Sequence, residues 1–185
     1  MTTPDHIAHI RTMAHNELRN YAIPGLSSSL IGHGHNKGTV RLFECSRNHH
    51  EPITPHSHRF DFQCLVLKGS VHNILWMPAL EHEEGDYFAA SELIYGAEPG
   101  KYSSADNTIN VSRYTATDQM FHAGDWYGMR ADEIHSIFFS RDAVVLFFEG
   151  PNITDTTTIL EPWVNGQRIP TFKVEDWMFD SNDIF

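Results

Sequence analysis

The stretch PHSHRFDFQCLVLKGS, residues 55–70, carries the two features that decide the fold of this 185-residue chain. It opens with two histidines separated by one residue, and its apolar continuation predicts a strand over 63–67. Side chains two apart on an extended strand point to the same side, with their Cα atoms roughly 7 Å apart. His56 and His58 are therefore candidate ligands of one metal ion, on a segment that Pro55 stiffens.

A second pair of histidines with the same spacing provides a comparison within the chain. His33 and His35 are surrounded by Gly32, Gly34 and Gly38, and such a glycine-rich segment predicts a flexible turn. The chain contains 13 histidines, so pairs of this kind arise easily by chance. We expect His33 and His35 to bind no metal.

The N-terminal residues 3–20 have the pattern of a helix. Thr3 is a suitable N-cap and Pro4 suits the first turn. Apolar residues recur at helical spacing and form one stripe, which consists of Ile7, Ile10, Ala14 and Leu18. Pro24 and Gly25 follow the predicted helix and end it.

The remainder of the chain changes to a period of two, which is typical of strands. Strands are expected at 40–45, 63–67, 71–76, 108–114, 134–139 and 143–148. A tight reversal at 140–142 joins the last two, and Asn165-Gly166 predicts a two-residue hairpin. Many short strands with one leading helix indicate an all-β barrel or sandwich.

Two segments lack this alternation. Residues 78–107 are polar and predict a long loop, which in a compact domain is usually a lid, an arm or an oligomer contact. We divide the single domain, residues 1–185, into an N-terminal helix and linker (1–25), a barrel (26–170) and a C-terminal docking segment (171–185). The docking segment is acidic and aromatic, and we expect it to pack on the barrel or on a second subunit.

Composition excludes several classes of protein. The formal net charge is −11, so the basic surface that a nucleic acid requires is not expected. No apolar run approaches the roughly 20 residues that span a bilayer, and the N-terminus lacks the pattern of a signal peptide. Cys45 and Cys64 make no disulfide framework, which favours a reducing compartment. We expect a cytoplasmic protein that binds neither nucleic acid nor membrane.

A longer pattern resembles the cupin superfamily. The two cupin signatures are G-x5-H-x-H-x3,4-E-x6-G and G-x5-P-x-G-x2-H-x3-N. His56, His58 and Gly69 match the first signature, and Gly124 and His135 match the second without an insertion. The resemblance covers roughly residues 38–150.

Half of the ten signature positions differ from the cupin pattern. The replacements, in chain order, are His50, Phe62, Arg130, Asp132 and Phe139. All three histidines of the signatures are kept, whereas Phe62 occupies the position of the glutamate. The resemblance therefore implies a metal site formed by histidines alone.

What the resemblance implies is an all-β fold, a cupin-type double-stranded β-helix (jelly-roll) barrel with one N-terminal helix, holding a metal on His56, His58 and His135. Three neutral imidazoles leave about three coordination positions open and suit one divalent transition metal. We favour Fe(II), with Zn, Ni, Mn or Cu as alternatives, and imidazole ligands disfavour Mg and Ca, which prefer oxygen ligands. Histidines alone leave the site charge near +2, which favours anionic ligands.

The ligand set is similar to that of three-histidine dioxygenase-type cupins, which include thiol dioxygenases. Cysteine dioxygenases carry a Ser-x-His-x-Tyr arrangement late in the barrel, whereas the corresponding strand at 143–149 contains no Ser, His or Tyr. The first functional hypothesis is a mononuclear metal-dependent dioxygenase or related oxidoreductase acting on a small organic substrate, with its catalytic residues unassigned. The alternative is a non-catalytic ligand-binding or sensor module, and a zinc-dependent isomerase or hydrolase is a third possibility.

Several residues near the histidines have mainly structural interpretations. Three residues after His56 and His58 also have even numbers and would point to the same side of an extended strand. We expect these residues, Phe62, Cys64 and Val66, to fill the barrel interior. Trp126, Tyr127 and Arg130 are expected in a turn before His135, which either rims the pocket or is purely structural. Exposed strand edges and the apolar C-terminal segment lead us to expect a homodimer.

Overall fold

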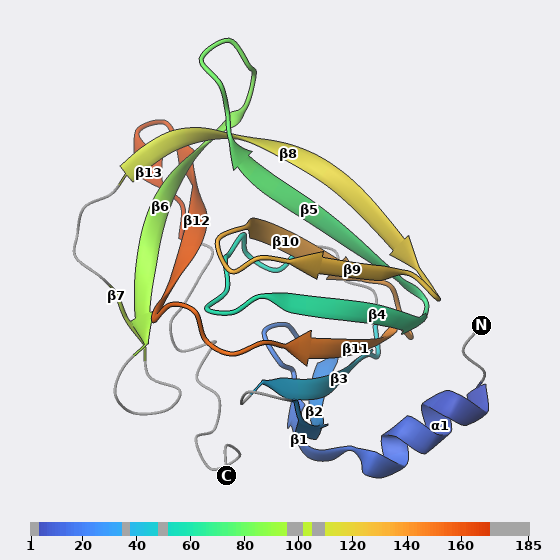
Figure 1. Cartoon of the computed structure of the whole chain (residues 1–185). Helices are drawn as coiled ribbons and strands as arrows, with labels where there is room; N and C mark the ends of the chain where they lie inside the picture. Colours follow the sequence, from blue (N-terminus) through green and yellow to red (C-terminus); the bar gives the residue numbers. More distant parts are fainter. Residues whose placement is uncertain (1–3, 35–37, 48–51, 96–101, 105–109, 171–185) are drawn as a thin grey trace.

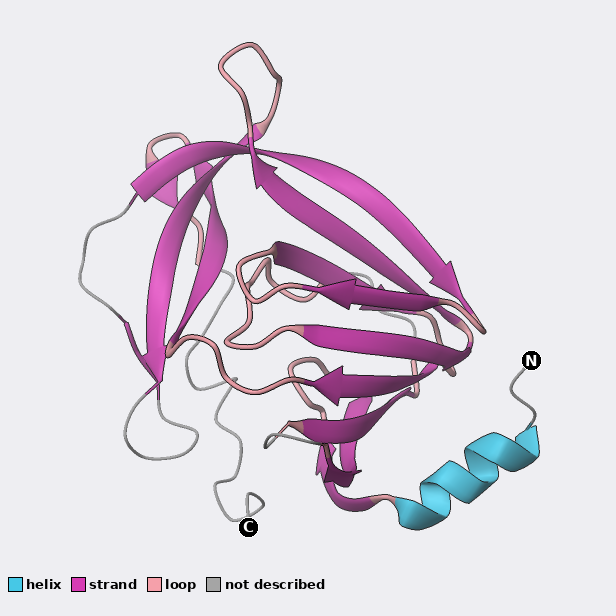
Figure 2. Ribbon diagram, in the orientation of Figure 1, coloured by secondary structure: helices cyan, strands magenta, loops and turns pink. Residues whose placement is uncertain are grey.

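The computed structural model describes residues 4–34, 38–47, 52–95, 102–104 and 110–170. In this part of the chain one helix precedes a succession of antiparallel strands (Figures 1 and 2). The elements are α1 (Pro4–Met13), β1 (His15–Arg19), β2 (Leu26–His33), β3 (Thr39–Cys45), β4 (Phe62–Lys68), β5 (Ser70–Pro78), β6 (Asp86–Tyr95), β7 (Tyr102–Ser104), β8 (Asn110–His122), β9 (Trp126–Met129), β10 (Ile134–Phe139), β11 (Val144–Glu149), β12 (Thr156–Val164) and β13 (Gln167–Arg168).

The strands form two sheets that face each other. The first has the order β1-β2-β3-β11-β4-β9, and the second has the order β10-β5-β8-β6-β12-β13, with β7 paired to β6. Segment 53–58 extends the second sheet beyond β10, because Ile53 N donates to Ile137 O at 3.1 Å and His56 N donates to His135 O at 2.9 Å.

Strand order identifies the fold. Seven strands and one extended segment form the barrel, in the chain order β3, segment 53–58, β4, β5, β8, β9, β10 and β11. One sheet contains β3, β11, β4 and β9 side by side, which are the first, eighth, third and sixth of these elements. The other sheet contains segment 53–58, β10, β5 and β8 side by side, which are the second, seventh, fourth and fifth. This is the arrangement of a jelly roll, so the predicted cupin-type double-stranded β-helix is confirmed.

The main core lies between the two sheets. Phe62, Cys64 and Val66 belong to it and are nearly inaccessible to solvent, which confirms their predicted role as interior filling. Tyr127 also belongs to this core, and it lies on strand β9. The prediction of a turn around residues 126–130 is therefore wrong over β9. There an exposed Trp126 alternates with the buried Tyr127, as a strand requires.

The segment 78–107, predicted as a long loop, contains strand β6. It pairs with β8 on one side and with β12 on the other (Figure 1). The prediction fails because β6 buries Phe88, Ala89 and Leu93, and this apolar content outweighs the polar residues around it. Phe88 packs in a second cluster with Tyr114 and Leu160, on the side of the second sheet away from the main core.

Segment 53–58 is held on both sides. It pairs with β10, as described above, and also with β12, because Ser57 N donates to Thr158 O at 2.8 Å and Leu160 N donates to Pro55 O at 2.9 Å. Since β12 continues through β6 and β8 to β5 and β10, the hydrogen-bonded strands return to segment 53–58. This closure places the segment between two strands, so it is not a free edge.

The helix predicted over 3–20 is shorter in the structure. Helix α1 ends at Met13, and β1 follows it and pairs with β2. Asn16 and Asn20, with φ of 50° and 55°, adopt left-handed conformations that interrupt a right-handed helix. Ile7 packs on the outer face of the first sheet, in a cluster with Leu42, Leu67 and Val144.

Both predicted reversals are present. Asn165 and Gly166 have φ of 51° and 77° and join β12 to β13, in agreement with the hairpin expected from these two residues. Ala143 N donates to Ser140 O at 3.1 Å in the turn before β11. The predicted C-terminal docking segment lies outside the described residues, and in the described part no helix is long and apolar enough to cross a membrane.

We predict that the closure through β12 contributes strongly to stability. Leu160 is fully buried in the second cluster, so Leu160→Ala should lower the free energy of unfolding by about 2–5 kcal/mol in urea denaturation. Leu80→Ala is the control, because Leu80 is 58% exposed and its truncation should change stability by no more than about 0.5 kcal/mol. Equal losses in the two variants would show that β12 is not integral to the fold.

Candidate metal centre

The backbone pairing of His56 with His135 defines the site. Each residue donates its N–H to the carbonyl oxygen of the other at 2.9 Å, which places the two side chains next to each other. His58 follows on the same segment, and its N–H donates to Ala131 O at 3.1 Å. Two segments that lie far apart in the sequence are thus locked together at the histidines.

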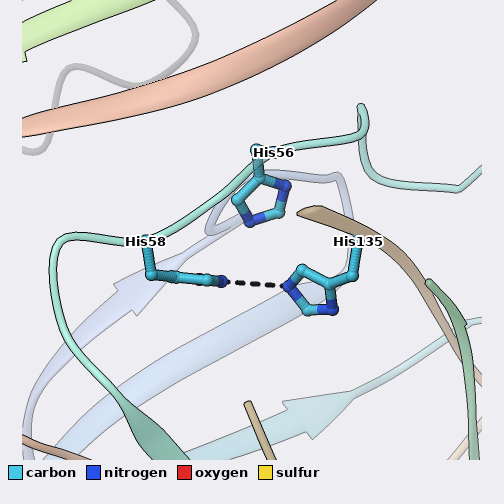
Figure 3. A group of neighbouring side chains, drawn as sticks. All are labelled: His56, His58 and His135. Atoms are coloured by element: carbon cyan, nitrogen blue, oxygen red, sulfur yellow. Dashed lines mark hydrogen bonds between the residues drawn. The ribbon is translucent and has the colours of Figure 1, made fainter. Parts of the chain in front are cut away.

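The three predicted histidines lie together (Figure 3). One ring nitrogen from each lies within 4.8 Å of the others, and His58 Nε2 is 3.0 Å from His135 Nε2. His56 and His135 are buried, with exposed fractions of 7% and 3%, whereas His58 is half-buried. The sequence therefore identified a group that the fold does bring together.

This geometry fits one transition-metal ion. Two nitrogens bound at about 2.1 Å to a common metal lie about 3.0 Å apart at an octahedral angle and about 3.4 Å apart at a tetrahedral angle. The His58–His135 separation of 3.0 Å is close to both values. Nitrogens within 4.8 Å of one another need only modest side-chain rotation to converge.

The comparison pair behaves differently. His33 is the last residue of strand β2 and is exposed, so the predicted flexible turn does not include it. His35 lies outside the described residues. Within the described part of the chain, His33 belongs to no group of three metal-ligating side chains. That it binds no metal stays a prediction.

Two of the rings have hydrogen-bond partners behind them. His56 Nδ1 contacts the carbonyl oxygen of Thr54 at 2.7 Å, and His135 Nδ1 contacts Asn73 Oδ1 at 2.6 Å. Both partners are neutral acceptors, so both Nδ1 atoms carry the proton. In this tautomer the lone pair of each ring lies on Nε2, as a metal ligand requires.

Burial keeps all three imidazoles neutral. Desolvation lowers the pKa of His56 to about 4, and the hydrogen bond to the Thr54 carbonyl opposes this shift. The pKa values of His58 and His135 are well below the usual value, first because of desolvation and then because of the neighbouring histidines. Neutral imidazole is the form that binds a metal, so the site is prepared for one at neutral pH.

An aromatic wall takes the place of the cupin glutamate. The Phe62 ring lies 4.7 Å from the His58 ring and 5.7 Å from the His135 ring, and Phe60 flanks His58 at 5.5 Å. Asp61 faces elsewhere, because its Oδ1 accepts the N–H of Ala131 at 2.8 Å. Within the described residues, the ligand group contains three histidines and no carboxylate.

Cys64 is not placed to act as a thiolate. Burial raises its pKa to about 12, and the thiol is hydrogen-bonded to Tyr127, directly opposite on β9. The pKa of Tyr127 is also raised well above its usual value by burial. Both groups stay protonated at neutral pH, and Cys64 serves as a core residue.

Sequence reasoning missed Asn73, which contacts His135. The sequence did contain a signal for Asn73, because it alternates with Val71 and Leu75 on the same side of a strand that was predicted correctly. An amide among apolar residues on a core-facing side needs a buried polar partner. Nothing in the sequence identified His135 as that partner.

Comparisons with known proteins yield structural similarities only. No protein-family model matches the sequence, and no curated protein matches it. The structure is similar to KdgF from Halomonas sp., with a TM-score of 0.41 and 14% identity over 73% of this chain and 87% of that one. It is also similar to hydroxypropylphosphonic acid epoxidase from S. wedmorenis, with a TM-score of 0.44 and 7% identity over 72% of this chain and 55% of that one.

A third similarity is to oxalate decarboxylase from Lactobacillus farciminis, solved as a formate complex. Its TM-score is 0.42 and its identity 12%, over 77% of this chain and 32% of that one. At these scores and identities the three proteins indicate nothing about the substrate or the metal of this chain. The fold rests on its own strand order, and the site rests on its own geometry.

We predict that the three histidines act as one site. Replacing any one of them by alanine removes a third of the ligand set, so His56→Ala, His58→Ala and His135→Ala should each abolish stoichiometric Zn²⁺ binding. His33→Ala is the matched control and should bind metal like the wild type. The measurement is metal analysis after reconstitution and gel filtration of protein without a histidine tag. Full occupancy in His135→Ala would contradict the three-residue site.

Proposed function

We propose that the protein is a mononuclear metal-dependent dioxygenase or related oxidoreductase that acts on a small organic substrate. The observation that carries this proposal is the convergence of three neutral imidazoles without a protein carboxylate. Such a ligand set occupies one face of a metal and leaves adjacent positions for two further ligands. A substrate and dioxygen are the pair of ligands that this arrangement suits.

The charge of the site favours an anionic substrate. Three neutral imidazoles leave the charge of a divalent ion uncompensated, and their described hydrogen-bond partners are a carbonyl and an amide, both neutral. A carboxylate, an enolate or a thiolate on the substrate would supply the missing negative charge. The protein surface has a net negative charge, so the attraction is local to the metal.

The surrounding residues suit a compact and partly apolar molecule. Phe60 and Phe62 flank His58, and Phe147 packs on Phe62 with ring centroids 4.9 Å apart. This wall excludes water from one side of the histidines and strengthens the interaction of a charged ligand with the metal.

A redox-active metal would supply electrons to dioxygen, and we favour Fe(II) for this reason. Zn, Ni and Mn fit the same nitrogen ligands. The protein's part is to hold three nitrogens in place, to keep the imidazoles unprotonated by burial, and to orient the substrate against the aromatic wall. We assign no residue as an acid or base in the reaction.

A non-catalytic ligand-binding or sensor module is the second candidate. The observation that favours it is the chemistry around the histidines: their described neighbours are phenylalanines, a carbonyl and an amide. None of these groups transfers a proton readily. In this alternative the metal binds an anionic ligand and no oxidation follows.

The test is oxygen consumption by the iron-loaded protein. We predict that protein reconstituted anaerobically with Fe(II) consumes dioxygen when it is offered a member of a panel of thiols and β-dicarbonyl compounds. His58→Ala should lose this consumption, because the metal loses one of its three ligands, while His33→Ala should retain it. An oxygen electrode gives the rate directly.

One outcome would replace the enzyme by the binding module. Protein isolated with stoichiometric zinc, together with an iron form that stays inert across the whole panel, would contradict the oxidoreductase. Binding of the same anionic compounds to the zinc form would then support the sensor.

A further inference from the structure

Asn73 is a buried polar residue behind the metal centre. It lies on β5, next to the strand that carries His135, and only 1% of its surface is exposed. The register pairs Asn73 with Ile137, so His135 is its diagonal neighbour on the same face of the sheet. The Asn73 side chain therefore points to the same side as the His135 ring.

Both ends of the Asn73 amide are hydrogen-bonded. Its Oδ1 accepts the Nδ1–H of His135 at 2.6 Å, and its Nδ2 donates to Oε1 of Gln119 at 3.1 Å. Gln119 lies directly opposite on β8 and is exposed. Because the NH₂ group of Asn73 donates its hydrogen bond to Gln119, the amide oxygen of Asn73 is the atom that faces His135.

This arrangement selects one tautomer of His135. An amide oxygen accepts hydrogen bonds and never donates them, so it requires the imidazole proton on Nδ1. The lone pair then lies on Nε2, the atom that faces His58 at 3.0 Å. Without Asn73, neutral imidazole would also populate the Nε2–H form, which cannot bind a metal through that atom.

We propose that Asn73 is a positioning residue of the metal centre, which fixes both the tautomer and the ring orientation of His135, with Gln119 fixing the amide in turn. The inference rests on the proposed function, because it assigns Asn73 to the same metal. Outer partners of metal-binding histidines typically affect metal affinity by about 10–100-fold.

The choice of an amide has a chemical consequence. A carboxylate in the same place would also accept the Nδ1–H, but it would add a negative charge beside the metal. Asn73 orients His135 while leaving the site charge near +2, which suits the anionic substrate proposed above. Asn73→Asp should therefore keep the tautomer and weaken the binding of anions.

Among the hydrogen bonds described at the three rings, the one to Asn73 is the most suitable for a test. The partner of His56 is the backbone carbonyl of Thr54, which no side-chain substitution removes. Asn73→Leu replaces the amide by an apolar group of similar size in the core, and exposed Gln119 regains a partner from water. We expect this variant to fold.

The experiment compares three variants with the wild type. Co²⁺ affinity is measured by absorption titration, azide affinity by titration of the cobalt form, and the His135 tautomer by ¹⁵N NMR of the metal-free protein. Asn73→Leu should weaken Co²⁺ binding by about 10–100-fold and shift His135 toward Nε2–H. Asn73→Asp should retain Nδ1–H and bind Co²⁺ at least as well as the wild type, with weaker azide binding.

Ser136→Ala is the matched structural control. Ser136 is fully buried next to His135 on β10, and its Oγ accepts the Trp76 Nε1–H at 2.9 Å. This variant loses a buried hydrogen bond on the opposite face of the strand, and it should leave the Co²⁺ affinity unchanged. Equal weakening in Ser136→Ala and Asn73→Leu would overturn the proposal, as would wild-type affinity in Asn73→Leu.

The two proposals fail separately. If the wild type binds no Co²⁺, the metal centre itself is contradicted, and the NMR measurement still decides whether Asn73 fixes the tautomer of His135. If the wild type binds Co²⁺ and the His135 tautomer is the same in Asn73→Leu, the metal centre stands and the positioning role is overturned.

Discussion

The interaction on which the rest depends is the reciprocal pair of backbone hydrogen bonds between His56 and His135. It joins two segments that are separated by most of the barrel, and it sets two imidazoles beside each other before any ligand takes part. Pairing with β12 holds segment 53–58 from its other side, so the residues that carry His56 and His58 are internal to a sheet. A site built on paired backbone is positioned more accurately than one built on a free loop.

Much of the fold was predictable because barrel strands have a simple period. Strand β4 buries Phe62, Cys64 and Val66 at alternate positions, and the Asn165-Gly166 hairpin depends on local backbone preferences alone. The failures arose where local pattern and tertiary packing disagree. The residues of β1 continue a helical stripe but pair with β2, and β6 lies in polar surroundings but buries Phe88 against distant partners.

The grouping of the three histidines was predictable from the sequence, but the residues that support it were not. His56, His58 and His135 have spacings that match a known pattern, and the fold brings them together. Asn73 matches no pattern, because its role depends on the register of β5 against β10, which a single sequence does not specify. The aromatic wall was likewise visible only as a missing glutamate at Phe62, whose packing on His58 required the folded chain.

The most direct test of the account is a crystal structure of the Zn²⁺-loaded protein. The account predicts one ion bound by a nitrogen of each of His56, His58 and His135 at about 2.0–2.1 Å, with water in the remaining positions and no other protein ligand. An oxygen of Asp61 or the sulfur of Cys64 in the coordination sphere would contradict it. An ion held without His135 would contradict it as well.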